Sequence, residues 1–196
     1  MKFYSLILLV TGLVLASNSK ATEYEFTPYI GYTYSDNLNG DISGEQLSIT
    51  NDANFGFSFA WQNGPNGQGM VLLNKVSHDY KSDLDNQTHS FDVVYAHFNG
   101  VAMFRQDKYI TTVSLGAGGA YFNTDSSSKM VPSLTAALGT RYEMSDKLAF
   151  VTEIRSYASL TNKANDLFCQ SSTCSAKLSD SVWLETSLSV GLTYKW

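Results

Sequence analysis

Hydrophobic and polar residues alternate with a period of two along much of this chain. In the segment 54–62, every second residue is bulky and aromatic, and the residues between are small or polar. The aromatic positions are Phe55, Phe57, Phe59 and Trp61. Successive side chains of a β-strand point to opposite faces, so this pattern predicts a strand with one apolar face and one polar face.

The same alternation recurs after residue 21 and predicts eight strands. The segments are 24–35, 54–62, 70–80, 91–96, 109–118, 133–143, 148–157 and 182–196. The third segment begins Met70-Val71-Leu72-Leu73, which is apolar on both faces, so the pattern leaves its facing open. No stretch after Ala21 offers the roughly 20 consecutive apolar residues of a transmembrane helix.

The predicted connections alternate between long and short. In chain order they are 36–52, 63–68, 81–88, 105–108, 123–130, 145–147 and 162–180. The longer ones therefore gather at one end. This order is typical of a closed, antiparallel transmembrane β-barrel with eight strands, short periplasmic turns and longer extracellular loops. A soluble eight-stranded barrel would hold its apolar faces inside and would need no such asymmetry.

An eight-stranded barrel has a narrow interior, so we expect the small and polar face of each strand inside and the bulky face outside. On this rule Phe91, Val93 and Tyr95 face lipid. The expected inward positions include Gly116, Gly118, Ala120, Ser133, Thr135 and Gly139. Aromatic residues at strand ends would form the interfacial girdles: Tyr24, Tyr34, Trp61, Tyr80, Tyr109, Tyr142, Tyr194 and Trp196.

A length of 196 residues with 43% hydrophobic and 16% charged residues fits one domain that is poor in charge. Residues 1–21 have the layout of a secretory signal: Lys2, an apolar run over 3–16, and small residues at Ser19 and Ala21. Cleavage after Ala21 would leave a barrel domain at 22–196. An uncleaved anchor is the alternative, but the apolar run is short for a bilayer span.

Loss of Lys2 and Lys20 would leave 11 of the 13 basic residues against 18 acidic ones, a net charge of −7. This balance argues against nucleic acid as a partner. Cys169 and Cys174 lie in a polar stretch, and export to an oxidising compartment predicts a disulfide between them, with two free thiols as the alternative. No His or carboxylate cluster accompanies the pair, so we expect no metal and no cofactor.

The final eight residues, 189–196, place Gly191, Tyr194 and a terminal Trp196 in a pattern that resembles the assembly signal of bacterial outer-membrane barrels. Phe is the commoner last residue, and Trp196 preserves its aromatic character. The resemblance implies that the barrel-assembly machinery handles this chain during insertion.

The last third of the chain resembles the opacity-protein and porin-like family of small eight-stranded barrels in Gram-negative bacteria. The resemblance rests on segments 153–157 and 167–169, on Cys174 and on the last strand. Membership implies the fold and a place in the cell outer membrane. We also expect outer-membrane lipid and lipopolysaccharide as partners, and a monomer. It supplies no reaction.

Five charged residues fall on the inward face of the last three strands, where opposite charges on neighbouring strands can pair. They are Arg141, Glu143, Glu153, Arg155 and Glu185. We expect a structural network of ion pairs that fills the barrel interior, because a buried charge that loses its partner is costly. The alternative is a charged constriction that lines a small pore.

His78 and His89 lie near the predicted extracellular strand ends, and His97 lies toward the periplasmic end, where we expect an interfacial side chain. A His beside a Ser and a carboxylate would suit a lipid-modifying barrel enzyme. No His-x-Ser-Asn pattern and no Gly-x-Ser-x-Gly elbow occurs, so exposed loop histidines and no catalytic residue are expected.

These observations favour a structural or surface-interaction role through the extracellular loops. A narrow porin-like transport barrel for a small solute or hydrophobic compound is the first alternative, and a lipid-modifying outer-membrane enzyme is the second.

Overall fold

The structure is a computed structural model that describes residues 23–35, 38–39, 46–81, 88–124, 128–161, 169–170, 173–174 and 182–196. Eight long strands form the barrel: β1 (Tyr24–Ser35), β4 (Asp52–Gly64), β5 (Gly67–Lys81), β6 (Thr88–Gln106), β7 (Tyr109–Thr124), β8 (Ser128–Glu143), β9 (Leu148–Ser159) and β12 (Trp183–Lys195). Four short strands lie in the connections: β2 (Leu38–Asn39), β3 (Gln46–Ile49), β10 (Cys169–Gln170) and β11 (Thr173–Cys174). Over these ranges, no helix has both the length and the apolar character needed to cross a membrane.

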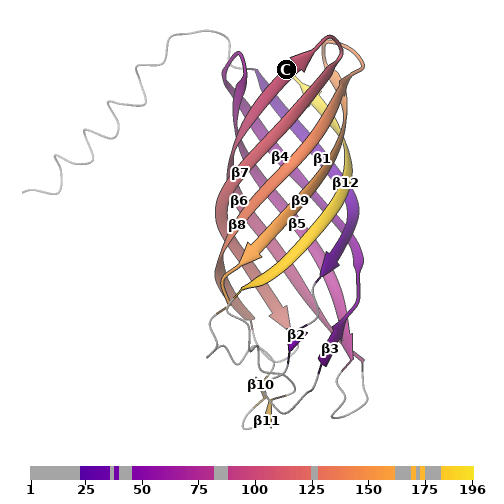
Figure 1. The fold of residues 1–196 in the computed structure, drawn as a ribbon, viewed down its shortest axis with the longest axis vertical. Coiled ribbons are helices and arrows are strands. Elements are labelled where there is room, and N and C mark those ends of the chain that lie inside the picture. Colours follow the sequence, from indigo (N-terminus) through magenta and orange to yellow (C-terminus); the bar gives the residue numbers. More distant parts are fainter. Residues whose placement is uncertain are drawn as a thin grey trace, which may run out of the picture.

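Each barrel strand pairs antiparallel with its two neighbours, and the sheet closes on itself (Figure 1). Closure joins the first strand to the last, with Tyr32 of β1 opposite Leu188 of β12. A closed sheet satisfies its backbone hydrogen bonds internally, and a strand-built structure in lipid requires this. The predicted eight-stranded antiparallel barrel is confirmed.

Three short connections lie at the end of the barrel where β1 begins and β12 ends, at the hydrogen-bonded pair Tyr24 and Trp196. They are the turns 65–66, 107–108 and 144–147. The other strand ends, at Ser35, Lys81, Thr124 and Ser159, lie at the opposite end of the barrel, and the two longest connections in the chain, 36–51 and 160–182, follow two of them. The end with the short turns is therefore periplasmic and the other is extracellular. β7 and β8 extend further than predicted, which shortens their connection to 125–127.

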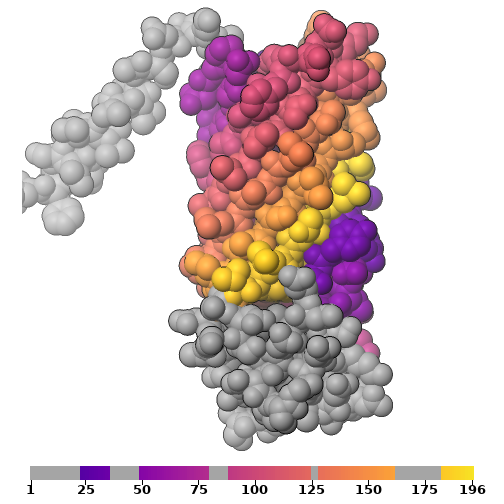
Figure 2. Space-filling view, viewed as in Figure 1, coloured from indigo at the N-terminus to yellow at the C-terminus, as the bar shows by residue number. Residues whose placement is uncertain are grey.

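The outer face of the barrel is apolar. In Figure 2, tilted rows of side chains from successive strands cover the visible wall. Exposed outward residues include Ile30, Phe55, Phe57, Leu115, Leu134, Leu138, Ile154, Leu188 and Leu192. Aromatic side chains cluster at the periplasmic end. The centroid of the Trp196 ring lies 6.3 Å from that of Tyr24 and 6.1 Å from that of Phe59. Tyr34, Tyr109, Tyr142 and Tyr194 are also exposed as expected, whereas the side chain of Tyr80 lies outside the described residues.

The facing of β5, left open by the sequence, places its even-numbered residues inside, with Leu72 and Val76 buried. The expectation for β6 is wrong, because Phe91, Val93 and Tyr95 point into the barrel and are buried. They join an apolar cluster in the extracellular half of the interior. Its other members are Ile49, Leu72, Val76, Ala120, Phe122, Val131, Tyr157 and Trp183. The rule that the bulky face of a strand points outward therefore fails in the extracellular half of the barrel, where apolar side chains fill the interior.

Candidate functional site in the barrel lumen

Polar and charged side chains fill the lumen in three groups along the barrel. The periplasmic layer consists of Glu25, Arg141, Glu143 and Lys195. The central layer consists of Asn99, Ser114, Thr135, Glu153 and Arg155. The extracellular layer consists of Ser35, His78, Tyr95 and Glu185.

In the periplasmic layer, Arg141 bridges two carboxylates. Its guanidinium lies 2.9 Å from both carboxylate oxygens of Glu25, and its Nε atom lies 3.1 Å from Glu143. Lys195 contacts the same Glu143 carboxylate. Glu25 and Lys195 are opposite each other in the β1–β12 register. Neither residue was in the predicted charged set. The first and last strands of any closed barrel pair with each other, and this pairing would have placed Glu25 and Lys195 side by side.

In the central layer, Arg155 donates to Glu153 through Nε at 2.7 Å and through a terminal nitrogen at 2.9 Å. The same guanidinium reaches Asn99 of β6, Ser114 of β7 and Thr135 of β8 at 3.2–3.3 Å. One side chain thus ties together four consecutive strands.

On the opposite wall, Tyr29 of β1 accepts a hydrogen bond from Ser58 of β4 at 3.3 Å, and Asn74 of β5 donates to Tyr157 at 3.1 Å. Together with the Arg155 contacts, these side chains project into the lumen from both walls. A cavity of about 40 Å³ remains near Glu25, Arg141 and Glu153. That volume holds a few waters at most.

The five predicted charged residues lie on the inward face, but their partners differ from the expectation. Arg141 pairs with Glu143, and Arg155 with Glu153, two residues apart on the same strand rather than across neighbouring strands. Residues two apart on a strand share a face, so a long Arg side chain can fold back onto its own strand. Glu185 lies apart from these cations, in the extracellular layer.

In the extracellular layer, Glu185 accepts three contacts. His78 Nε2 lies 2.6 Å and Ser35 Oγ 2.5 Å from its Oε1 atom, and the Tyr95 hydroxyl contacts Oε2. His78 Nδ1 lies 2.9 Å from the carbonyl oxygen of Thr50. The prediction of an exposed loop histidine is wrong for His78, whose side chain is fully buried.

Ser35, His78 and Glu185 are the residue types of a hydrolytic triad, and Ser35 Oγ lies 3.4 Å from His78 Nε2. In a triad the imidazole faces the serine with one nitrogen and the acid with the other. Here Nε2 faces both groups, and Nδ1 faces a carbonyl oxygen. With Nδ1 facing a carbonyl oxygen and Nε2 facing the Glu185 carboxylate, neither nitrogen is free to take a proton from Ser35. The arrangement is therefore a salt bridge with hydroxyl donors and not a triad.

The other histidines occupy different surroundings. His97 is buried in the lumen, where its ring stacks on Tyr95 at 5.9 Å and lies tilted against Tyr157 at 5.7 Å between ring centroids. The expected interfacial position is therefore wrong, because His97 lies on the same inward face as Tyr95. His89 lies half-buried at the extracellular start of β6. Among the described residues, no group of three or more His, Cys, Asp or Glu side chains is arranged to hold a metal ion.

The C-terminal residues occupy both faces of β12. Tyr194 and Trp196 stack on the outer face with ring centroids 5.9 Å apart. Gly191 faces inward, and a Cβ atom there would lie 2.7 Å from the Pro28 carbonyl oxygen, so this close approach of β1 and β12 requires glycine. Cys169 lies directly opposite Cys174 in the β10–β11 pair. Their side chains lie outside the described residues, so the disulfide stays a prediction.

Comparison with solved structures finds small barrels of the outer membrane. Neisserial surface protein A aligns over 90% of this chain and 100% of its own, with a TM-score of 0.56 and 12% identity. The N-terminal β-barrel domain of Pseudomonas aeruginosa OprF aligns over 89% and 97%, with a TM-score of 0.49 and 10% identity. The attachment invasion locus protein Ail of Yersinia pestis aligns over 88% and 99%, with a TM-score of 0.47 and 17% identity.

No protein-family model and no curated protein matches the sequence. The first of these likenesses supports the fold alone. Combined with the apolar exterior and the closed sheet, the fold makes this chain a β-barrel protein of the cell outer membrane.

Proposed function

We propose that this barrel is a structural or surface-interaction protein that acts through its extracellular connections. We also propose that the side chains in its lumen form a rigid plug that blocks passage through the barrel. The observation that carries the proposal is the central layer, in which Arg155 joins four strands across the interior. Such a layer stiffens the barrel and occupies the path that a solute would take. What remains for function is the surface that the barrel displays.

The extracellular end supplies that surface. The two longest connections, 36–51 and 160–182, join strand ends at this end of the barrel, whereas the periplasmic turns are too short to bind a partner. A rigid scaffold that carries long loops is a common arrangement for recognition. We place outer-membrane lipid and lipopolysaccharide around the wall and the assembly machinery at β12 during insertion, and we assign the mature protein as a monomer.

Conductance separates this proposal from a narrow transport barrel. Purified, refolded protein is added to planar bilayers, and a heat-modifiability gel shows that the same sample is folded. We expect no discrete channels from folded protein. Reproducible channels that change when Arg155 or Arg141 is replaced would instead establish transport through the lumen and would contradict the plug.

Attachment of intact cells tests the surface role. Cells that produce the protein are compared with cells that produce a variant in which 163–180 is replaced by a short Gly-Ser turn. The surfaces are coated with sulfated glycan, with extracellular-matrix protein or with nothing. We expect attachment to at least one coating to fall in the variant while its folded level in the outer membrane is unchanged. Equal attachment by both strains, and by a strain shortened in 36–51, would overturn the proposal.

The Ser35, His78 and Glu185 contacts give a specific test of the enzyme alternative. The ion-pair geometry and full burial of His78 and Glu185 favour no catalysis. Purified protein in mixed micelles with phospholipid or lipid A is expected to release no fatty acid above the level of Ser35→Ala. Release that depends on Ser35 would establish a hydrolase.

A further inference from the structure

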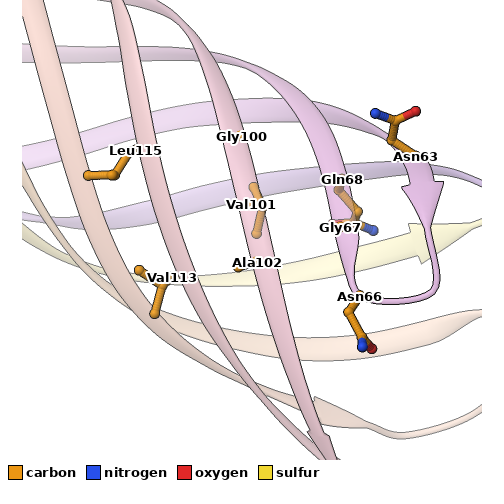
Figure 3. Close-up of a pocket in the computed structure, with 9 residues that line it drawn as sticks. All are labelled: Asn63, Asn66, Gly67, Gln68, Gly100, Val101, Ala102, Val113 and Leu115. Atoms are coloured by element: carbon orange, nitrogen blue, oxygen red, sulfur yellow. The ribbon is translucent and has the colours of Figure 1, made fainter.

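The connection 36–51 returns to the barrel beside the buried pair His78 and Glu185. Its last strand, β3, pairs with β5 at the extracellular end of the barrel (Figure 1). A hollow on the outer wall near the periplasmic turns differs from this place, because its lining side chains are neutral and it faces lipid (Figure 3). Chemistry that depends on charge is therefore available at the extracellular end and not in that hollow.

The end of this connection is seated in the mouth of the barrel. The Ile49 side chain is buried and joins the apolar cluster that fills the extracellular half of the lumen. The Thr50 backbone donates to the Asp79 carbonyl oxygen at 2.8 Å, and the Ser35 backbone donates to the Asn51 side chain at 3.2 Å. These contacts join the connection to β5 and to β1, so its last residues belong to the barrel.

His78 fastens this seat to the opposite wall. Its Nδ1 atom lies 2.9 Å from the Thr50 carbonyl oxygen, and its Nε2 atom lies 2.6 Å from Glu185 Oε1. Both oxygens are acceptors, so a ring that satisfies both carries a proton on each nitrogen and a positive charge. A neutral ring has a single N–H, and the lone pair of its other nitrogen then faces an oxygen lone pair. Thr50 and Glu185 are therefore held together by the charged ring.

Two carboxylates act on the His78 ring. Glu185 of β12 contacts it directly, and Asp52 of β4 interacts with it electrostatically. Tyr95 of β6 supplies a titratable hydroxyl, which donates to Glu185. The ring packs against Phe91, with ring centroids 5.3 Å apart. Loss of the ring proton would remove the cation that lies between the two carboxylates and the seated connection.

We propose that His78 is a pH-sensitive clasp for the connection 36–51. The imidazolium holds Thr50 in the mouth of the barrel, and loss of its proton as the pH rises loosens the end of the connection. Histidine is the side chain whose ordinary pKa lies closest to neutral pH, which suits it to this role. The inference rests on the proposed function, in which this connection is part of the contact surface: the surface is fixed at lower pH and looser at higher pH.

Hydrogen exchange of the refolded protein in lipid nanodiscs tests the clasp. Peptides that span 49–53 report on the seat, and their rates are corrected for the intrinsic pH dependence of exchange. From about pH 5 to about pH 10, on both sides of the ordinary histidine pKa of about 6.5, their protection should fall. The fall should be about ten-fold or more, as expected for loss of one charge-assisted hydrogen bond. Peptides of β7 and β8 should keep their protection.

Three variants assign the effect. His78→Gln cannot titrate, so its protection at 49–53 should not change with pH. His89→Gln removes another histidine of the extracellular end and should behave like the wild type. Glu185→Gln removes the charge that faces the imidazolium and should move the transition to lower pH. This variant keeps the test available if His78→Gln does not fold on the heat-modifiability gel.

The outcomes separate the clasp from the proposed function. Wild-type protection that does not change with pH, or a transition that persists in His78→Gln or is unmoved in Glu185→Gln, would overturn the clasp and leave the surface role standing. Simultaneous loss of protection in β7 and β8 would show that the whole barrel loosens and would also overturn it. A transition that depends on His78, in a protein whose shortened 36–51 connection leaves attachment unchanged, would support the clasp and reject the surface role of that connection.

Discussion

His78 and Glu185 face each other inside the barrel, with His78 Nε2 2.6 Å from Glu185 Oε1 and both side chains fully buried. They come from β5 and β12, which are not neighbours in the sheet, so the pair crosses the lumen. Ser35 and Tyr95 donate to the same carboxylate. This one carboxylate therefore links its own strand, β12, to β1, β5 and β6 at the extracellular end of the barrel.

Glu185→Ala is expected to lower the free energy of unfolding by about 3–5 kcal/mol, because it leaves the donors of Ser35, His78 and Tyr95 buried without their acceptor. Urea unfolding in lipid vesicles measures the change. Glu185→Gln keeps the acceptor oxygen and should lose clearly less. A loss of the same size in both variants would show that the charge matters and the hydroxyl contacts do not.

Arg155→Met should also destabilise the barrel, because it strands the Glu153 carboxylate, whose side chain is 11% exposed. The expected cost of stranding a buried charge is about 3–5 kcal/mol. The double variant Arg155→Met, Glu153→Gln should recover part of this loss, since neighbouring members of one network are not additive. Strictly additive effects would mean that the two side chains do not act as a pair.

The fold was predictable because three signals point to the same architecture: the alternation of apolar and polar residues, the need to close a sheet in lipid, and the order of long and short connections. The periodicity of β4 fixes Phe55, Phe57 and Phe59 on one face, and the glycine and serine between them leave only that face to meet lipid. Closure of the sheet then follows from the absence of edges in a bilayer. No further information was needed to place the inward residues of β1, β8, β9 and β12.

The facing of β6 could not be predicted in this way. Alternation gives the period of a strand but not which face is inside, and Phe91, Val93 and Tyr95 are as apolar as a lipid-facing set. Their actual position follows from contacts distant in sequence, such as Tyr95 stacked on Tyr157 with ring centroids 4.0 Å apart. One local signal existed: Asp92 lies on the other face and pairs outside the barrel with Lys75 at 2.7 Å.

The partners of the charged residues were equally hidden. The sequence places Arg141 and Arg155 on inward faces, but which carboxylate each reaches depends on strand tilt and side-chain length. Arg141 crosses from β8 to Glu25 on β1, a separation of 116 residues. His78 was misplaced because its neighbour Asp79 and its position near a strand end are also typical of an exposed loop.

Phe57→Arg tests the lipid face. Phe57 is 44% exposed and opposite Pro28 and Leu73 near the middle of β4, β1 and β5. Arginine there should cost roughly 2–4 kcal/mol, whereas at Phe104, near the periplasmic end of β6, it should cost about 0–1 kcal/mol. Unfolding in vesicles compares the two. Equal costs would contradict the membrane position assigned to the barrel.

Cys169 and Cys174 are expected to form a disulfide, because directly opposed residues of an antiparallel pair have Cα atoms at a separation that a disulfide can bridge. Non-reducing peptide mapping of protein from the outer membrane should recover the two cysteines in one linked peptide. Alkylation of both thiols without prior reduction would contradict the prediction. Cys169→Ser, Cys174→Ser should leave the barrel itself folded on a heat-modifiability gel, since the bridge lies beyond β9.

Deletion of Trp196 should impair assembly. The Trp196 backbone exchanges two 3.1 Å hydrogen bonds with Tyr24, and its ring packs on Tyr24, Phe59 and Tyr194. Its loss removes both the end of the pairing that closes the barrel and the terminal aromatic residue of the proposed assembly signal. Trp196→Phe keeps both and should accumulate normally, whereas Trp196→Ala keeps only the backbone pairing. Immunoblots of the outer-membrane fraction separate the backbone role from the signal role. Low levels of Trp196→Ala would show that the aromatic ring is needed for the assembly signal. Normal levels of the deletion variant would refute both roles.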